Sequence, residues 1–252
     1  MRSAPVSRGT ERRRVLVTHV TQYTGPGAVD ALLAADCTVY AHDASFADAT
    51  ARAAYEAAHH GVAALAAQGA DALADELEAL GVLPDAVVSN DVYPITRAPI
   101  ESIALDDLRN TFEAVLLFPF RLTQRWLPAM KARGAGCFVF VTSARELRPE
   151  PGFAVPTTIR AGTTAFAQAL AKETAADGIQ ANVVAPNYLY SELYYPRARF
   201  IDDPAGRARI AEIVPAGRLG TQAEAGELIA FLASGKSAFM TGQVLYFTGG
   251  WP

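Results

Sequence analysis

A strand, a turn and a helix follow one another in residues 15–35, which read VLVTHVTQYTGPGAVDALLAA. The β-branched run over 15–18 predicts a short strand, and the threonines and glycines of 21–27 are typical of a turn. Apolar residues then recur at helical spacing over 28–35. A strand that leads through a short turn into a helix is the first half of a βαβ unit.

The remaining chain continues the alternation of strands and helices. Further strands are expected over 37–41, 86–89, 137–142, 180–184 and 243–247. Helices are expected over 47–67, 71–80, 105–131, 157–176 and 223–234, and an aromatic-rich irregular stretch over 186–203. The strand over 137–142 is apolar on both faces, as a strand inside a parallel sheet should be. The pattern predicts one α/β domain, a doubly wound parallel sheet of the Rossmann type with helices on both faces.

The composition fits a chain with a large buried core and excludes several classes of protein. Of 252 residues 51% are hydrophobic, and the formal net charge of −4 argues against nucleic acid or an anionic membrane as a partner. Cys37 and Cys137 are too few for a disulfide framework and are expected as buried thiols. No cysteine or histidine cluster predicts a metal site, and His42, His59 and His60 are expected on the surface or in loops.

The N-terminal residues 1–14 carry five arginines but lack the apolar core of a signal peptide. We expect them to form a flexible tail ahead of a single domain over 15–252. No apolar run approaches the roughly 20 residues that cross a bilayer. A cytoplasmic protein is therefore expected.

A ligand of such a fold binds outside the carboxyl ends of the strands. The loops after Thr18, Ser89, Thr142 and Val184 are therefore expected to converge on the functional site.

The order of these pieces resembles the short-chain dehydrogenase/reductase superfamily over nearly the whole chain. In that family a Thr-Gly-x-x-x-Gly-x-Gly turn follows the first strand, and its glycines leave room for the pyrophosphate of NAD(P). Here His19 and Tyr23 replace the first two glycines, and Gly25 alone is retained. A ring at Tyr23 would occupy the place of the dinucleotide, so no cofactor is expected. An NAD(P)-dependent dehydrogenase with a shifted cofactor is the alternative.

The catalytic strip of that family is altered as well. Dehydrogenases carry a serine, a tyrosine about thirteen residues on and a lysine four residues later; here Ser143 is followed by Pro156 and Arg160. The helix asparagine of the dehydrogenases aligns with Val115. Arginine in place of the lysine is the mark of the halohydrin dehalogenases, a branch that uses the same fold without a nucleotide. The chain resembles that branch.

The resemblance implies the reversible conversion of a vicinal halo-alcohol into an epoxide and halide, or the opening of epoxides by small anions. Ser143 would hold the substrate oxygen, and Asp91 would fix Arg160 by a charge-assisted bond. The expected partners are a small-molecule substrate and a halide. The resembled families are homotetramers, which implies the same assembly here.

The halide site implied by the resemblance is the loop Pro186-Asn187-Tyr188-Leu189, whose backbone N–H groups would converge on the anion. The rings of Tyr23 and Tyr195 would border it.

Pro156 leaves this reaction without the tyrosine that is the family's general base. Proline has neither acid nor base character, although it suits the first turn of a helix. One possibility is a substitute base, either Tyr188, Tyr190 or Thr157 with a water polarised by Arg160. A second is another cofactor-free elimination, cyclisation or isomerisation, and a third is a non-catalytic assembly subunit.

Overall fold

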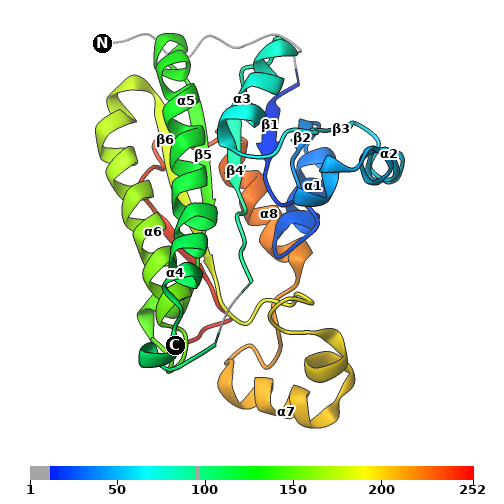
Figure 1. The fold of residues 1–252 in the computed structure, drawn as a ribbon, viewed down its shortest axis with the longest axis vertical. Coiled ribbons are helices and arrows are strands. Elements are labelled where there is room, and N and C mark those ends of the chain that lie inside the picture. Colours follow the sequence, from blue (N-terminus) through cyan, green and yellow to red (C-terminus); the bar gives the residue numbers. More distant parts are fainter. Residues whose placement is uncertain (1–11, 95–96) are drawn as a thin grey trace.

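Seven parallel strands form the centre of the computed structural model, which describes residues 12–94 and 97–252 (Figure 1). The strands are β1 (Arg14–Val17), β2 (Thr38–Ala41), β3 (Val62–Ala64), β4 (Ala86–Ser89), β5 (Gly136–Val141), β6 (Ile179–Pro186) and β7 (Val244–Phe247). Their order is β3-β2-β1-β4-β5-β6-β7. The chain reverses its direction across the sheet between β1 and β4, which is the switch point where this fold binds ligands.

Helices cover both faces of this sheet, as Figure 1 shows. They are α1 (Gly25–Ala34), α2 (Ala49–Ala58), α3 (Ala70–Ala79), α4 (Leu105–Phe112), α5 (Phe118–Arg133), α6 (Ala154–Thr174), α7 (Pro204–Ile213) and α8 (Gln222–Ala233). The predicted doubly wound α/β fold is confirmed. Within the described ranges no helix has the length and apolar character of a membrane span.

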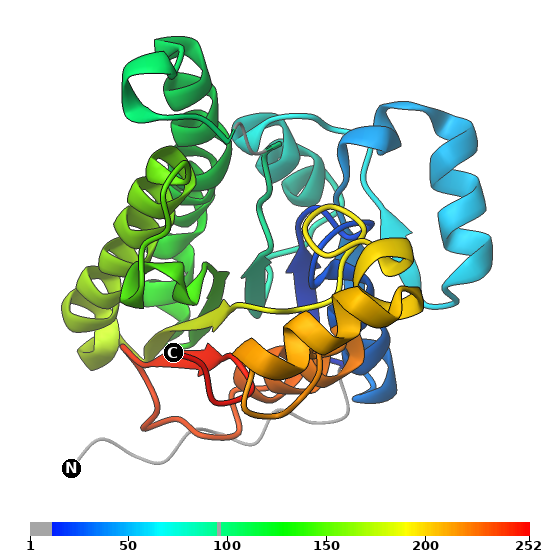
Figure 2. The same ribbon diagram turned by 90° about the horizontal axis from the view of Figure 1, so that it is seen from below.

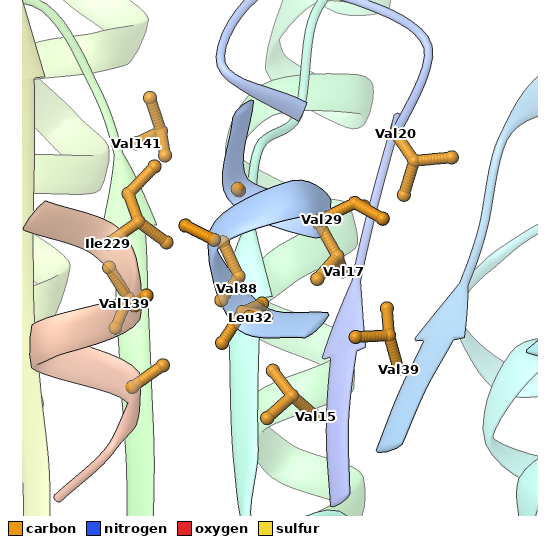
Figure 3. Packing of buried hydrophobic residues seen from close by; sticks show 14 of the residues in the cluster. Val15, Val17, Val20, Val29, Leu32, Val39, Val88, Val139, Val141 and Ile229 are labelled. Atoms are coloured by element: carbon orange, nitrogen blue, oxygen red, sulfur yellow. The ribbon is translucent and has the colours of Figure 1, made fainter. Parts of the chain in front are cut away.

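Valines of the central strands pack against α1 and α8 on one face of the sheet (Figure 3). Val15, Val17, Val88 and Val139 are fully buried there, together with Leu32 of α1. The alternate strand residues point to the opposite face and pack beneath α3, α5 and α6. The central strands are buried on both faces of the sheet, which explains why their sequences are continuously apolar.

Two glycines bring the backbones of α1 and α8 into direct contact. A Cβ atom on Gly27 would lie 1.9 Å from the carbonyl oxygen of Gln222, and one on Gly226 would lie 2.0 Å from that of Gly27. The side-chain amide of Gln222 also donates a hydrogen bond to the carbonyl oxygen of Tyr23. The turn that follows β1 is therefore anchored to α8.

Three expectations from the sequence need correction. The helix predicted over 47–67 ends at Ala58, because Gly61 turns the chain at φ 94° and residues 62–64 pair with β2 as a third strand. Helix α7 was not predicted; it begins at Pro204, with the carboxylate of Asp203 accepting hydrogen bonds from the first turn. The segment predicted as one helix over 105–131 contains a π-helical turn between α4 and α5.

The predicted boundary between tail and domain also moves. Residues 1–11 lie outside the described part of the chain. Arg13 donates a hydrogen bond of 2.6 Å to the carbonyl oxygen of Ala233, and Arg14 is the first residue of β1. The domain thus begins before residue 15.

His42 lies in the loop directly after β2, as one of the two expectations had it, but it is buried, with 3% of its surface exposed. Its ring stacks on Phe118 at 5.5 Å and meets the edge of His19 at 5.4 Å. Neither ring nitrogen has a hydrogen-bond partner among the described residues. Burial, reinforced by the neighbouring His19, lowers the pKa of His42 from 6.5 to about 4.

Replacing His42 by phenylalanine is expected to make the protein less sensitive to acid. The unfolded chain binds a proton at His42 below pH 6.5 and the folded chain only below about pH 4, so folding stability falls as pH decreases through that window. This difference in pKa lowers the free energy of unfolding by about 2 kcal/mol between pH 8 and pH 5. Urea unfolding of both proteins at the two pH values measures this difference. His60→Phe, at an exposed histidine, is the control and should retain the pH dependence of the wild type.

Candidate functional site

A cavity of about 40 Å³, here called the chamber, lies at the carboxyl end of the sheet beside the switch point. Its wall is formed by the loops after β1, β5 and β6 and by the first turns of α6. The lining residues are Tyr23, Ser143, Arg145, Pro156, Thr157, Arg160, Pro186, Asn187, Tyr188, Leu189, Tyr194 and Tyr195. The structure thus brings together the site residues predicted from the sequence, except Asp91 and the possible substitute base Tyr190.

Two residues of the chamber were missed in the sequence. Arg145 follows Ser143 by two residues, and Tyr194 is next to Tyr195. Proximity along the chain was the available signal for both. Only the turn of the backbone after β5 decides that Arg145 faces the chamber.

Tyr23 fills the turn that follows β1. It has a φ of 53° and His19 has a φ of 48°, a left-handed conformation that non-glycine residues rarely adopt. The Tyr23 ring is 6% exposed, meets Tyr194 edge-on at 5.1 Å and lies 5.7 Å from the guanidinium carbon of Arg160. Burial raises the pKa of the Tyr23 phenol, and the charge of Arg160 opposes the rise.

The residues of this region do not fit a dinucleotide. Besides the ring of Tyr23 in the turn, the carboxylate of Asp43 after β2 is already saturated. It accepts hydrogen bonds from the backbone and hydroxyl of Thr21 at 3.2 and 2.6 Å and from those of Ser45 at 3.0 and 2.8 Å. Burial raises the pKa of Asp43, but these hydrogen bonds outweigh it and lower that pKa overall. The carboxylate holds the turn to β2 and is not free to bind a ribose.

Arg160 is buried, with 7% of its surface exposed, beneath the chamber. It donates a hydrogen bond of 2.7 Å to the carbonyl oxygen of Val141 and one of 3.0 Å to that of Asp91. The expected ion pair with the carboxylate of Asp91 is wrong. That carboxylate turns toward β1, where it accepts a hydrogen bond of 2.7 Å from Thr18 and lies 3.1 Å from Nδ1 of His19.

The guanidinium of Arg160 is therefore held by two neutral carbonyl groups. Within the described part of the chain no carboxylate forms an ion pair with it. Its positive charge stays available to a group bound in the chamber.

Hydrogen-bond donors without partners surround the chamber. The amide nitrogen of the Asn187 side chain and the hydroxyl of Thr157 are buried and unbonded. The oxygen of the Asn187 side chain accepts from the backbone N–H of Tyr188 at 3.0 Å and from the hydroxyl of Tyr195 at 3.3 Å. This leaves the Asn187 nitrogen as a free donor, and unpaired buried donors of this kind commonly mark a ligand site.

The predicted halide loop offers fewer backbone donors than expected. Pro186 has no N–H, the N–H of Asn187 donates to the carbonyl oxygen of Phe247, and that of Tyr188 is used by the Asn187 side chain. The backbone N–H of Leu189 makes no hydrogen bond to any described residue. The loop therefore presents one backbone donor and one side-chain amide.

The phenols at the chamber are weak acids. Burial raises the pKa of Tyr195 to about 12, and burial also raises that of Tyr188. Tyr190, one of the proposed substitute bases, does not line the chamber; its hydroxyl donates to Glu192 at 2.8 Å. Tyr188 and Thr157 of the proposed set remain at the site.

Known proteins similar to this chain carry two kinds of name, reductase and dehalogenase. Residues 25–252 match the family model described as enoyl-(acyl carrier protein) reductase. A solved structure described as "Dehalogenation enzyme" is 37% identical, covers 96% of this chain and 99% of its own, and has a TM-score of 0.90. Another, "Halohydrin dehalogenase (HheC) bound to ethyl (2S)-oxiran-2-ylacetate", is 34% identical, covers 95% and 97%, and has a TM-score of 0.91.

Curated relatives carry reductase names. The 3-oxoacyl-(acyl-carrier-protein) reductase FabG of Salmonella typhimurium is 34% identical over 145 residues, which is 58% of this chain and 57% of that protein. The alignment thus spans less than two thirds of the curated relative. The family model, in contrast, matches residues 25–252, nearly all of this chain. The chain belongs to the short-chain dehydrogenase/reductase superfamily.

Proposed function

We propose that this protein is a cofactor-independent enzyme of the halohydrin dehalogenase type, acting on a vicinal halo-alcohol or on the corresponding epoxide. The observation that carries the proposal is Tyr23, whose buried ring fills the turn where the superfamily binds NAD(P) and closes a small chamber in its place. The similarity to two dehalogenase structures over nearly their whole length supports the same assignment.

The chamber suits a small anion and the reacting end of a small substrate. Its volume of about 40 Å³ corresponds to roughly three water molecules. The free N–H of Leu189 and the amide of Asn187 lie on the β6 side, and the Arg160 cation lies beneath the α6 side. Donors fixed before the reaction stabilise charge that develops during it.

The proposed reaction is an internal displacement. The hydroxyl oxygen of the substrate, held by Ser143, forms a bond to the neighbouring carbon, while the carbon–halogen bond breaks and its electron pair leaves with the halide. The hydroxyl proton passes through a water bonded to Thr157 to the solvent, while the charge of Arg160 stabilises the oxygen that loses the proton. The halide stays with the donors of Asn187 and Leu189 until it is released.

Pro156 makes this a slow reaction, because a water is a poorer proton acceptor than a phenolate. Its side chain lines the chamber at the start of α6, four residues before Arg160. A phenol introduced there would lie one helical turn from the cation, which favours the phenolate form.

The variant Pro156→Tyr is therefore expected to release chloride from 1-chloro-2-propanol about 100-fold faster than the wild type, the usual contribution of a general base. Chloride release measured at pH 8, with epoxide opening by azide as the reverse assay, gives the result. Pro156→Phe is the matched control, since it adds the ring without the hydroxyl, and its rate should stay at the wild-type level. Equal rates for the Tyr and Phe variants contradict the proposal.

The reductase names of the curated relatives make an NAD(P)-dependent reductase the second candidate function. One binding experiment distinguishes it from the dehalogenase. A ligand at 100 times its Kd raises the unfolding free energy by about 2.7 kcal/mol. We expect NADPH and NADH to leave the melting temperature unchanged, because the ring of Tyr23 fills the turn and the carboxylate of Asp43 is already hydrogen-bonded. Stabilisation by NADPH together with reduction of a 3-oxoacyl thioester would overturn the proposed function.

A further inference from the structure

A second, larger cavity of about 650 Å³ adjoins the chamber. Arg145, Tyr188, Tyr194 and Tyr195 line both cavities, so the larger one, here called the vestibule, is the immediate neighbour of the chamber. Its outer wall includes residues of α7, which lies at the carboxyl end of the sheet in Figures 1 and 2. A substrate whose reacting end lies in the chamber extends into this space.

The vestibule is rich in positive charge. Four arginines line it, and the two acids on its wall are Glu150 and Asp203. The carboxylate of Asp203 is occupied as the cap of α7, accepting hydrogen bonds of 3.1 and 3.2 Å from backbone N–H groups. Among residues 12–94 and 97–252, Arg97, Arg199 and Arg209 make no ion pair. Low-dielectric walls of one sign concentrate anions in a cleft.

Arg145 is the cation at the junction of the two cavities. Its guanidinium carbon lies 4.0 Å from the centroid of the Phe153 ring, which fixes its direction. The Nε atom is buried and has no hydrogen-bond partner. Arg145 forms an ion pair with Glu150 at 3.6 Å, a separation too long for a hydrogen bond, and the Glu150 side chain is 37% exposed. The guanidinium also forms a hydrogen bond with the hydroxyl of Tyr195.

A buried N–H without a hydrogen bond, such as the Nε–H of Arg145, is costly unless a ligand completes it. Because the fork of N–H groups on arginine matches the two oxygens of a carboxylate, a substrate carboxylate is the group that best fits this place. The substrate carboxylate is not expected in the chamber itself, because the anion that binds there is the leaving halide. The reacting end of the substrate would therefore lie in the chamber and its charged arm in the vestibule.

We propose that the substrate carries a carboxylate on an arm that extends from the chamber into the vestibule, and that Arg145 selects for it. This assignment of the substrate class rests on the proposed dehalogenase function. Arg97, Arg199 and Arg209 contribute long-range attraction, and Arg145 contributes the direct contact.

The test compares two substrates that differ in charge, 4-chloro-3-hydroxybutanoate and its ethyl ester. The wild type is expected to show a kcat/KM about 30-fold higher for the acid, the effect of one hydrogen-bonded charge pair. In Arg145→Gln this preference should disappear, through loss of turnover of the acid and not of the ester. The matched control is Arg148→Gln, which removes the same charge at an exposed place outside both cavities and should retain the preference.

A binding measurement separates failure of this inference from failure of the proposed reaction. 3-Hydroxybutanoate and its ethyl ester lack the leaving group, and calorimetry gives their affinities without turnover. If neither chlorinated compound releases chloride but 3-hydroxybutanoate binds at least about tenfold more tightly than its ester, the reaction is wrong and the vestibule assignment stands. Equal binding of acid and ester by the wild type overturns the assignment, and this comparison does not depend on the folding of any variant.

Discussion

Replacing Arg160 by alanine is expected to lower halide release from a vicinal halo-alcohol about 1000-fold, the upper end of the range for removal of a preorganised electrostatic group. Arg160 is the cation beneath the chamber with no carboxylate partner in the described structure, whereas Arg145, the other cation on the chamber wall, is paired with Glu150 and also lines the vestibule. Chloride release under single-turnover conditions measures the effect on chemistry, apart from substrate binding.

The same substitution should also destabilise the fold. Arg160 joins the carbonyl oxygen of Val141 at the end of β5 to that of Asp91 after β4, at 2.7 and 3.0 Å. Without the guanidinium both buried oxygens lose a donor, which costs about 2–4 kcal/mol in total. Urea unfolding monitored by far-UV circular dichroism gives this value.

Arg160→Lys distinguishes charge from geometry, because an ammonium group retains the charge but cannot form the two-pronged contact. Its activity should recover only in small part relative to the alanine variant. If Arg160→Ala remained folded and released halide at the wild-type rate, Arg160 would have no role in the proposed chemistry.

A methyl group added at Gly27 is expected to destabilise the protein by more than about 3 kcal/mol, above the usual cost of overpacking, because the obstacle is backbone. The new Cβ would lie 1.9 Å from the carbonyl oxygen of Gln222 and 2.3 Å from its carbon. Helix α1 must then move away from α8, and the turn that presents Tyr23 moves with it.

Gly162→Ala is the matched control for Gly27→Ala, since both glycines lie in helices. Its Cβ would meet only the end of the Leu116 side chain, at 2.8 Å, and that side chain can rotate. Because alanine also favours helix, we expect a change within about 1 kcal/mol of the wild type. Thermal unfolding of both variants gives the comparison, and similar melting temperatures would contradict the close contact between α1 and α8.

The fold and most of the chamber followed from the sequence for one physical reason. Parallel strands deliver their carboxyl ends to one edge, so Tyr23, Ser143 and the loop 186–189 had to converge once the alternation of strands and helices was recognised. Tyr23 itself was identifiable because a ring in place of a glycine changes which ligand the turn admits.

The features that the sequence did not reveal depend on side-chain direction and tertiary pairing. Asp91 contacts Arg160 through its carbonyl oxygen, because its carboxylate is taken by Thr18 and His19 across the switch point. The strand over 62–64 is alanine-rich and was predicted as helix, since helix propensity is a weaker determinant than pairing with a neighbouring strand. The vestibule was missed because α7, part of its wall, was not predicted.

The hydrogen bonds of Asp43 would make a nucleotide site difficult to build into this chain. Mutating His19 and Tyr23 to glycine would empty the turn, yet Thr21 and Ser45 would still hold the carboxylate of Asp43 through four hydrogen bonds. Replacing Tyr23 alone removes a buried ring and supplies no ribose contact in return. Laboratory evolution starting from this chain would therefore reach new small-molecule chemistry in the chamber more readily than binding of a redox coenzyme.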